Sequence, residues 1–354
     1  MTPDAALSIG ARRAESPGLW TLAWRRFCRD RVGLVSFLIV VFFFGLMAAS
    51  GLHLIAADWS KEVGVNFAPP TFVGPAIRDS DPSAPVAAES PGIRPSAGQG
   101  EIEIVDPLAE ALADIRAQSS AASVADAQAS TLVFGGDRWG RDVLKKTIKG
   151  TETSMFVGLV AAFLAAFLAT VFGALAGYYG GWIDDFFNWF YSVFTSIPYL
   201  LLILAIAAVL NQKGTLTVIL ILGLTGWTGI FRLIRAEYLK HKVREYIQAA
   251  DAIGASHARR MFVHILPNVS HVILVQLSLH VVLFIKSEVV LSFLGFGVGV
   301  DTVSWGSMLN EAQSELILGY WWQLAAATIA MALLVTGFSL FTDALRDALD
   351  PKLK

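Results

Sequence analysis

The sequence predicts an all-α membrane protein with six transmembrane helices. Composition is the first indication, because 55% of the residues are hydrophobic and only 16% are charged, against about 45–50% and about 25% in soluble domains. Distribution is the second: the apolar residues gather in long uncharged segments, and a helix needs about 20 such residues to cross a bilayer. These features exclude a soluble enzyme and a disordered chain. The net charge of −2 offers no basic surface for nucleic acid.

Six segments between charged residues are long enough to cross a membrane, the short fourth one with its flanks. They lie between Arg31 and Asp58, Glu152 and Asp184, Asp185 and Lys213, Lys213 and Arg232, Arg260 and Lys286, and Glu315 and Asp343. The first is too long for the apolar part of a cleaved signal peptide and is expected to remain as a span. Pro198 is expected to kink the third, since proline deletes a backbone hydrogen bond.

The distribution of basic residues predicts the orientation. Arginine and lysine gather in the N-terminal tail and between the fourth and fifth spans: Arg12, Arg13, Arg25, Arg26, Arg29, Arg31, Arg232, Arg235, Lys240, Lys242, Arg244, Arg259 and Arg260. With six spans, both segments lie on the same side as the C-terminus, which is then the cytoplasmic side. Two smaller groups of charges do not fit this orientation: it places Lys145, Lys146 and Lys149 outside, and Asp184 and Asp185 inside. The larger basic segments outweigh them.

The chain divides into a cytoplasmic tail, a first span, an extracytoplasmic insertion and a membrane domain, which cover residues 1–31, 32–57, 58–133 and 134–354. The tail is expected to carry an interfacial amphipathic helix over residues 17–31. Within the insertion, the stretch Ser80–Gly100 is expected to be irregular and residues 106–128 helical. The insertion is either a cap that contacts a soluble partner or an addition without a specific role.

Two short stretches around the second span carry further expectations. Residues 142–153 are expected to form an interfacial helix whose lysines meet lipid headgroups. Gly173, Gly177 and Gly181 place small residues on one face of the span, which lets another backbone approach closely. Tight packing within one subunit is sufficient to explain that spacing.

The polar segment 245–267 between the fourth and fifth spans decides the functional interpretation. Gly254 is placed to end a short helix, because glycine readily takes the left-handed conformation of a helix stop, and Ser256 is placed to cap the next helix. Pro267 lies where the fifth span begins. We therefore expect two short helices with a sharp turn, and small residues at Ala249 and Ala250 that suit docking into a cleft on another protein.

This segment resembles the EAA loop of ATP-binding-cassette (ABC) importer permeases. The resemblance lies in Gln248-Ala-Ala, followed by Gly254 and then by Leu266-Pro267. In that family the loop is the coupling helix that docks on the ATPase subunit. Gln248 stands where glutamate is usual, and His264 where isoleucine is usual. The resemblance assigns ATPase coupling to Glu245, Tyr246, Gln248, Ala249, Ala250, Gly254, Ala255 and Pro267.

Four further segments resemble the dipeptide/oligopeptide permeases, of the second permease subunit type. They are Phe134-Gly-Gly-Asp-Arg-Trp-Gly-Arg-Asp-Val-Leu144, in which Gly136 replaces the usual threonine, Leu291-Ser-Phe-Leu-Gly-Phe-Gly297, Ser304-Trp-Gly-Ser-Met-Leu309 and Asp343-Ala-Leu-Arg-Asp-Ala-Leu-Asp-Pro351. The resemblance covers residues 17–57 and 134–354. Nickel permeases share much of the pattern.

The resemblance implies the six-helix type I ABC importer architecture, with a cytoplasmic coupling helix and an extended periplasmic insertion. It implies a multi-pass protein of the bacterial inner membrane, with both termini in the cytoplasm, that translocates di- or oligopeptides. The expected partners are a second homologous permease, two cytoplasmic ATPases and a periplasmic substrate-binding protein. Nickel complexes and antibiotic-like peptides stay open as substrates.

No catalytic residue, metal site or cofactor is expected in this chain. It lacks the G-x-x-x-x-G-K-[ST] phosphate-binding motif, so the partner ATPases would bind ATP and Mg²⁺. His257, His264 and His271 are seven residues apart along a helix, too far for one metal ion. An intramembrane enzyme is disfavoured because no catalytic pair lies within the spans.

Two residues of the fifth span are candidates for the transport pathway or its gate. Glu288 matches a glutamate that is usual in the family, and charges within membranes are often functional. It is expected near the outer surface, with Ser292 close by, and loop packing is the alternative role. A stand-alone secondary carrier is disfavoured, since such proteins show inverted repeats and buried charges within their spans.

Overall fold

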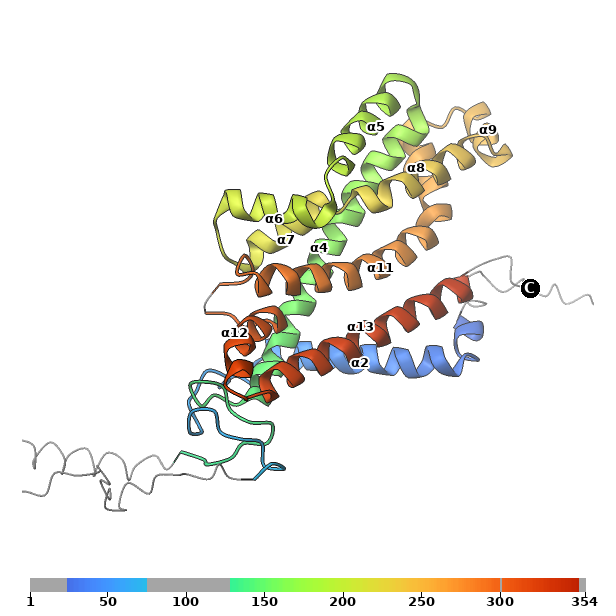
Figure 1. The fold of residues 1–354 in the computed structure, drawn as a ribbon. Coiled ribbons are helices and arrows are strands. Elements are labelled where there is room, and N and C mark those ends of the chain that lie inside the picture. The colour runs from blue at the N-terminus through green and yellow to red at the C-terminus, as the bar shows by residue number, and fades with distance from the viewer. Residues whose placement is uncertain (1–23, 75–127, 300, 350–354) are drawn as a thin grey trace, which may run out of the picture.

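The computed structural model describes residues 24–74, 128–299 and 301–349. These residues form helices, and their extended backbone is limited to isolated bridges (Figure 1). The helices are α2 (Arg31–Gly51), α4 (Val143–Tyr179), α5 (Gly181–Thr195), α6 (Tyr199–Leu210), α7 (Thr215–Thr225), α8 (Thr228–Lys242), α9 (Glu245–Ala252), α10 (His257–Arg259), the π-helical turn η1 (Arg260–Ile265), α11 (Leu266–Phe293), α12 (Trp305–Ile317) and α13 (Trp322–Leu349).

Some expectations lie outside the described residues. They include residues 17–23 of the amphipathic helix, whose described part is helical over residues 24–27, the irregular stretch Ser80–Gly100 and nearly all of the helix at 106–128. The two ends of the insertion are described and join each other, because Gly64 forms a bridge with Ala129 and Pro70 with Leu132. Residues 58–74 and 128–142 therefore form one layer of loops.

The predicted six spans are confirmed, and two of them are broken. Four helices are long and apolar enough to cross a membrane by themselves: α2, α4, the continuous helix His257–Phe293 and α13. The pair α5 and α6 is bent by 81°, and the pair α7 and α8 by 40°. Counting each pair as one span gives six.

Pro198 causes the larger break. It precedes α6 as its N-cap residue, and it has no N–H with which to continue the helical hydrogen bonds of α5. The predicted kink is therefore present as a complete change of direction. At its other end α6 stops at Asn211, whose backbone is left-handed with φ 45°.

Two predicted boundaries around the insertion are corrected. The first span ends at Gly51 instead of residue 57, and left-handed residues at His53 and Ala56 turn the chain away. The expected interfacial helix at 142–153 is wrong, because α4 runs unbroken from Val143 to Tyr179. Its lysines do not all meet headgroups, since Lys146 is buried.

Helix α4 is the centre of the molecule and packs against α2, α7, α8 and α11. Its close approach to α8 depends on glycine: a Cβ at Gly177 would lie 2.6 Å from the carbonyl oxygen of Arg235 and 2.7 Å from Cβ of Tyr238. Gly173 packs on the same helix. Gly181 does not belong to this face, because α4 ends at Tyr179 and Gly181 begins α5 after a left-handed turn.

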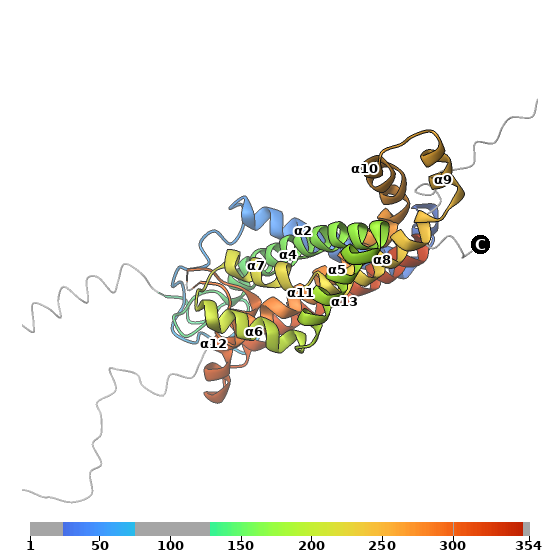
Figure 2. The same cartoon turned by 90° about the horizontal axis from the view of Figure 1, so that it is seen from above.

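The two ends of the molecule are distinct in both views (Figures 1 and 2). At one end, called the α9 end, α9 and α10 project beyond the other helices, and the end of α13 lies there too. At the opposite end, called the α12 end, α12 lies beside the loops of residues 58–74 and 128–142. Helix α4 extends from the α12 end toward the α9 end, so it connects them.

Candidate functional site

The α9 segment, residues 245–260, has the predicted helix and turn. Helix α9 ends at Ala252, and Gly254 takes the left-handed conformation with φ +81°. Oγ of Ser256 then accepts a hydrogen bond from the N–H of Arg259 at 3.3 Å and caps α10. The second helix is not short, however, because α10, η1 and α11 form one helix from His257 to Phe293. Pro267 therefore lies inside this helix, directly after the π-helical turn.

The predicted coupling residues divide into an outer and an inner set. Glu245, Gln248, Ala249 and Gly254 are exposed, whereas Ala250 is buried. Ala249 and Ala250 therefore do not form one small face, since neighbouring positions of a helix point about 100° apart. Ala255 is half-buried in the turn.

Two of these residues fasten α9 to the end of α8. The hydroxyl of Tyr246 lies 2.8 Å from Nδ1 of His241, and Nε2 of Gln248 donates to the carbonyl oxygen of Val243 at 3.2 Å. Gln248 therefore has a local role that needs no charge, which accounts for an amide at this position.

Apolar side chains at the tip of the α9 segment were missed by the sequence analysis. Ile253, in the turn, is 86% exposed, and Val243, just before α9, is 68% exposed. Burying each on another protein would contribute roughly 1.5–3 kcal/mol. The tip is therefore a surface suited to a protein partner.

A hydrogen-bonded cluster links the α9 segment to α4. The hydroxyl of Tyr178, near the end of α4, lies 3.0 Å from Nδ1 of His257. Arg260 contacts the same imidazole nitrogen at 3.0 Å and also pairs with Asp251 of α9. The sequence analysis considered His257 only as a metal ligand, so it missed this contact. These groups therefore connect α9 with α4.

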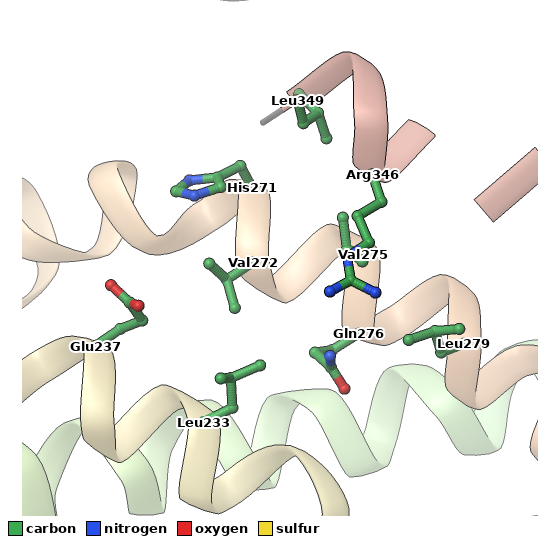
Figure 3. A pocket seen from close by; sticks show the side chains of 9 residues that line it. All are labelled: Leu233, Glu237, His271, Val272, Val275, Gln276, Leu279, Arg346 and Leu349. Carbon is green, nitrogen blue, oxygen red and sulfur yellow. The ribbon is translucent and has the colours of Figure 1, made fainter. Parts of the chain in front are cut away.

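A hollow of about 380 Å³ lies between α8, α11 and α13 near the α9 end. Figure 3 shows the side chains from the three helices around it. Leu233 and Glu237 come from α8, Arg346 and Leu349 from α13, and the remaining lining residues from α11: His271, Val272, Val275, Gln276 and Leu279. Polar groups thus face one another between three spans.

At the α12 end, the segment 134–144 folds around the carboxylate of Asp137. Asp137 is fully buried, and its Oδ1 accepts hydrogen bonds from the N–H groups of Trp139 at 2.9 Å and Arg141 at 3.0 Å. Gly140 allows the turn, since a Cβ there would lie 1.9 Å from the carbonyl oxygen of Gly64. The motif is therefore an anion-centred turn packed on the ends of the insertion.

Lys146 is the buried cation that holds this end together. Its Nζ donates to Oδ2 of Asp137 at 2.8 Å, to Oε2 of Glu311 at 2.5 Å and to Oε1 of Gln323 at 3.2 Å. The loop, α4, α12 and α13 are thereby joined at one atom. Two carboxylates and an amide compensate the cost of burying the ammonium group.

Glu315 of α12 lies beside this network and is only half satisfied. Its Oε1 accepts a hydrogen bond from the N–H of Arg138 at 3.2 Å, while Oε2 is buried without a hydrogen-bond partner among the described residues. Burial raises the pKa of Glu315 to about 6. The helix α12 is outside the six spans, so this carboxyl belongs to the extramembrane network, and its pKa lies above the usual value of a glutamate.

Glu288 is buried within α11 and connects three helices. Its Oε2 accepts a hydrogen bond from Oγ of Ser154 on α4 at 2.8 Å, and its Oε1 accepts one from Oγ of Ser292 at 2.7 Å. Ser154 in turn accepts from the N–H of Trp305, the first residue of α12, at 3.3 Å. The two candidate gate residues are thus in direct contact, and the Glu288 carboxylate is buried among these helices near the C-terminal end of α11.

Comparison with known proteins identifies the class. Residues 169–354 match the binding-protein-dependent transport system inner membrane component family, and residues 18–70 match the N-terminal TM domain of oligopeptide transport permease C. The chain therefore belongs to the binding-protein-dependent transport system inner membrane component family. It is a permease subunit of an ABC importer, and the resemblance seen in the sequence is confirmed.

Named relatives give the subfamily. The chain is 38% identical to the dipeptide transport system permease protein DppC of Bacillus subtilis over 62% of this chain and 69% of that protein. It is 39% identical to the glutathione transport system permease protein GsiD of Salmonella typhimurium over 62% of this chain and 72% of the relative. The chain is 29% identical to the dipeptide transport system permease protein DppC of Lactococcus lactis, over 93% of this chain and 90% of that protein.

Proposed function

We propose that this permease translocates di- or oligopeptides, driven by ATP hydrolysis in partner subunits. The family membership supports the transport role, and the names of the relatives, which transport dipeptides and glutathione, support the peptide class. A nickel or antibiotic-peptide permease of the same family is the alternative. A stand-alone secondary carrier is disfavoured, because the exposed α9 segment would have no partner in it.

The observation that carries the mechanism is the α9 segment and its connection to α4. Its exposed tip docks into a cleft of the ATPase, with Glu245, Tyr246, Gln248, Ala249, Ala250, Gly254, Ala255 and Pro267 forming or shaping the contact. Closure of the ATPases moves α9, and Tyr178 and Arg260 pass the movement through His257 to α4. This chain needs no cofactor for that role, since ATP and Mg²⁺ belong to the ATPases.

The assembly that follows has two permeases, two ATPases and a soluble binding protein. The α9 end, which carries both termini of the described helical core, faces the cytoplasm of a bacterial cell, and the α12 end faces the periplasm. The second permease is a homologous chain that packs beside this one in the inner membrane. The binding protein delivers peptide to the α12 end.

Glu288 and Ser292 act as a gate clamp within this mechanism. Because Glu288 joins α4, α11 and the start of α12, movement of α4 is transmitted to the α11–α12 loop at the periplasmic mouth. The pathway then opens alternately at the two ends.

Reconstitution tests the proposed function. The complex of both permeases and both ATPases is placed in proteoliposomes with its binding protein, and uptake of a dipeptide, a longer peptide and a nickel complex is measured with and without ATP. We expect ATP-dependent uptake of peptide. Uptake of the nickel complex alone would replace the peptide assignment, and uptake without ATPases would contradict the importer mechanism.

A further inference from the structure

A hollow of about 430 Å³ opens at the α12 end between the 134–144 turn, α12 and the α11–α12 loop. Its volume falls within the range of small-molecule sites, about 300–1,000 Å³. Three segments that resemble the peptide permeases converge on it, although they lie far apart in the sequence: each contributes lining residues, among them Arg138, Ser292 and Ser307. If these three segments only packed against adjacent helices, they would not all need to border the same open space.

The hollow has an excess of positive charge. Lys146 and Arg141 line it but are held by Asp137 and Glu311. Arg138 and Lys213 also line it, are exposed, and have no ion-pair partner among the described residues. Since Glu311 is already bound to Lys146, no carboxylate of the lining neutralises these two cations. The site therefore attracts an anionic group.

Aromatic side chains supply an apolar wall beside the charges. Trp59 and Trp139 both line the hollow, and the guanidinium carbon of Arg138 lies 3.6 Å from the ring centroid of Trp139. The stacking orients the guanidinium group while leaving its N–H donors available. A ligand with a carboxylate next to an apolar side chain fits both features, as the carboxyl end of a short peptide does.

One lining residue connects the hollow to the proposed gate. Ser292 lines the hollow, and its hydroxyl donates to Glu288. The loop backbone lies directly on Ser292, because a Cβ at Gly297 would come within 1.8 Å of its Oγ. A ligand in the hollow therefore rests against the loop that the Glu288 clamp holds.

We propose that this hollow receives the C-terminal carboxylate of the peptide as it leaves the binding protein, with Arg138 and Lys213 as the binding cations. The inference rests on the proposed function and names the place on this chain where the substrate first binds. A hollow favours a small ligand over an acidic surface of the binding protein. Docking of the binding protein at this site is the alternative, and it would contradict the proposal.

The test compares the double variant Arg138→Gln/Lys213→Gln with the unaltered complex in proteoliposomes. Uptake is measured for a tripeptide and for the same peptide with a C-terminal amide, each at a concentration that saturates the binding protein. Affinity of the loaded binding protein for the complex is measured separately. Lys61→Gln is the matched control, because Lys61 is exposed in the same loop layer but does not line the hollow.

We expect the double variant to lose about tenfold in uptake of the free-acid peptide, the effect of one charge-assisted hydrogen bond, and to handle the amide as the unaltered complex does. Binding-protein affinity and the control should be unchanged. Equal losses for both peptides, weaker docking of the binding protein, or no loss would each overturn the inference. If the unaltered complex imports neither peptide, the proposed function fails instead.

Discussion

Lys146 shows how a single residue defines the α12 end. Its partners Asp137, Glu311 and Gln323 are 9, 165 and 177 positions away in the sequence. By sequence alone it is one of three closely spaced lysines next to a span, and proximity to headgroups is the natural expectation. Only the folded chain brings the carboxylates to it, so this residue could not have been placed in advance.

Lys146→Met tests the buried network. The change leaves Asp137 and Glu311 without their common cation, and breaking a buried pair costs about 3–5 kcal/mol. We expect a large drop in the thermal unfolding midpoint of the purified complex. Lys149→Met is the control, since its pair with Glu152 is part-exposed and is worth about 0–1 kcal/mol. Similar midpoints for the two variants would contradict the network.

Glu315 predicts a pH dependence of stability. Burial raises its pKa from 4.5 to about 6, so the folded state holds a proton that the unfolded chain has released between these values. The stabilisation is complete below the lower pKa and is lost as pH rises through the higher one. The loss is about 2 kcal/mol.

The measurement is the unfolding midpoint of the detergent-solubilised complex at acidic and neutral pH. Glu315→Gln removes the titrating group, so the decrease over this interval should shrink in the variant. An identical decrease in both proteins would assign the pH dependence to other groups.

At the scale of elements, turns and caps could be predicted better than contacts. Gly254, Ser256 and Pro198 have local signals that depend on backbone chemistry, and each acts where expected. The continuation of α10 into α11 was missed, because Pro267 indicates a helix start, whereas it lies inside a continuous helix shortly after a π-helical turn. The link from His257 to Tyr178 has no signal in the sequence at all.

Gly254→Val should uncouple transport from ATP hydrolysis. A β-branched residue is strained at φ +81°, so the α9 tip would lose its position on the ATPase while the spans still insert. We expect uptake to fall severalfold more than ATP hydrolysis by the reconstituted complex. Gly254→Asn, which tolerates the left-handed conformation, should keep coupling. Normal uptake by the valine variant would contradict the role of this turn in coupling ATP hydrolysis to transport.

Tyr178→Phe tests the connection between α9 and α4. Removing the hydroxyl deletes one hydrogen bond to His257 while the ring remains packed, so we expect fewer peptides imported per ATP hydrolysed and little change in stability. Tyr179→Phe is the matched control, since Tyr179 is the next residue in the chain and its ring is half exposed. Equal ratios in the two variants would mean that force reaches α4 by another route.

For the whole molecule, the number of spans was the strongest prediction. Long uncharged segments fix it, because a helix of that length satisfies all its backbone hydrogen bonds within the segment while it crosses the lipid. The family was also accessible, since the EAA-like segment and the motifs at 134–144 and 291–297 occur in order. Their convergence on one hollow could not be predicted, because it depends on how α11, α12 and the loop layer pack together.

The central claim is that this chain is a permease driven through the α9 segment, and co-purification tests it most directly. The tagged chain is isolated in mild detergent beside Ile253→Asp, which places a charge at the most exposed apolar position of the tip. The account predicts two ATPases and a second permease with the unaltered chain, and loss of the ATPases alone from the variant. A chain that purifies by itself, or a variant that keeps its ATPases, would contradict it.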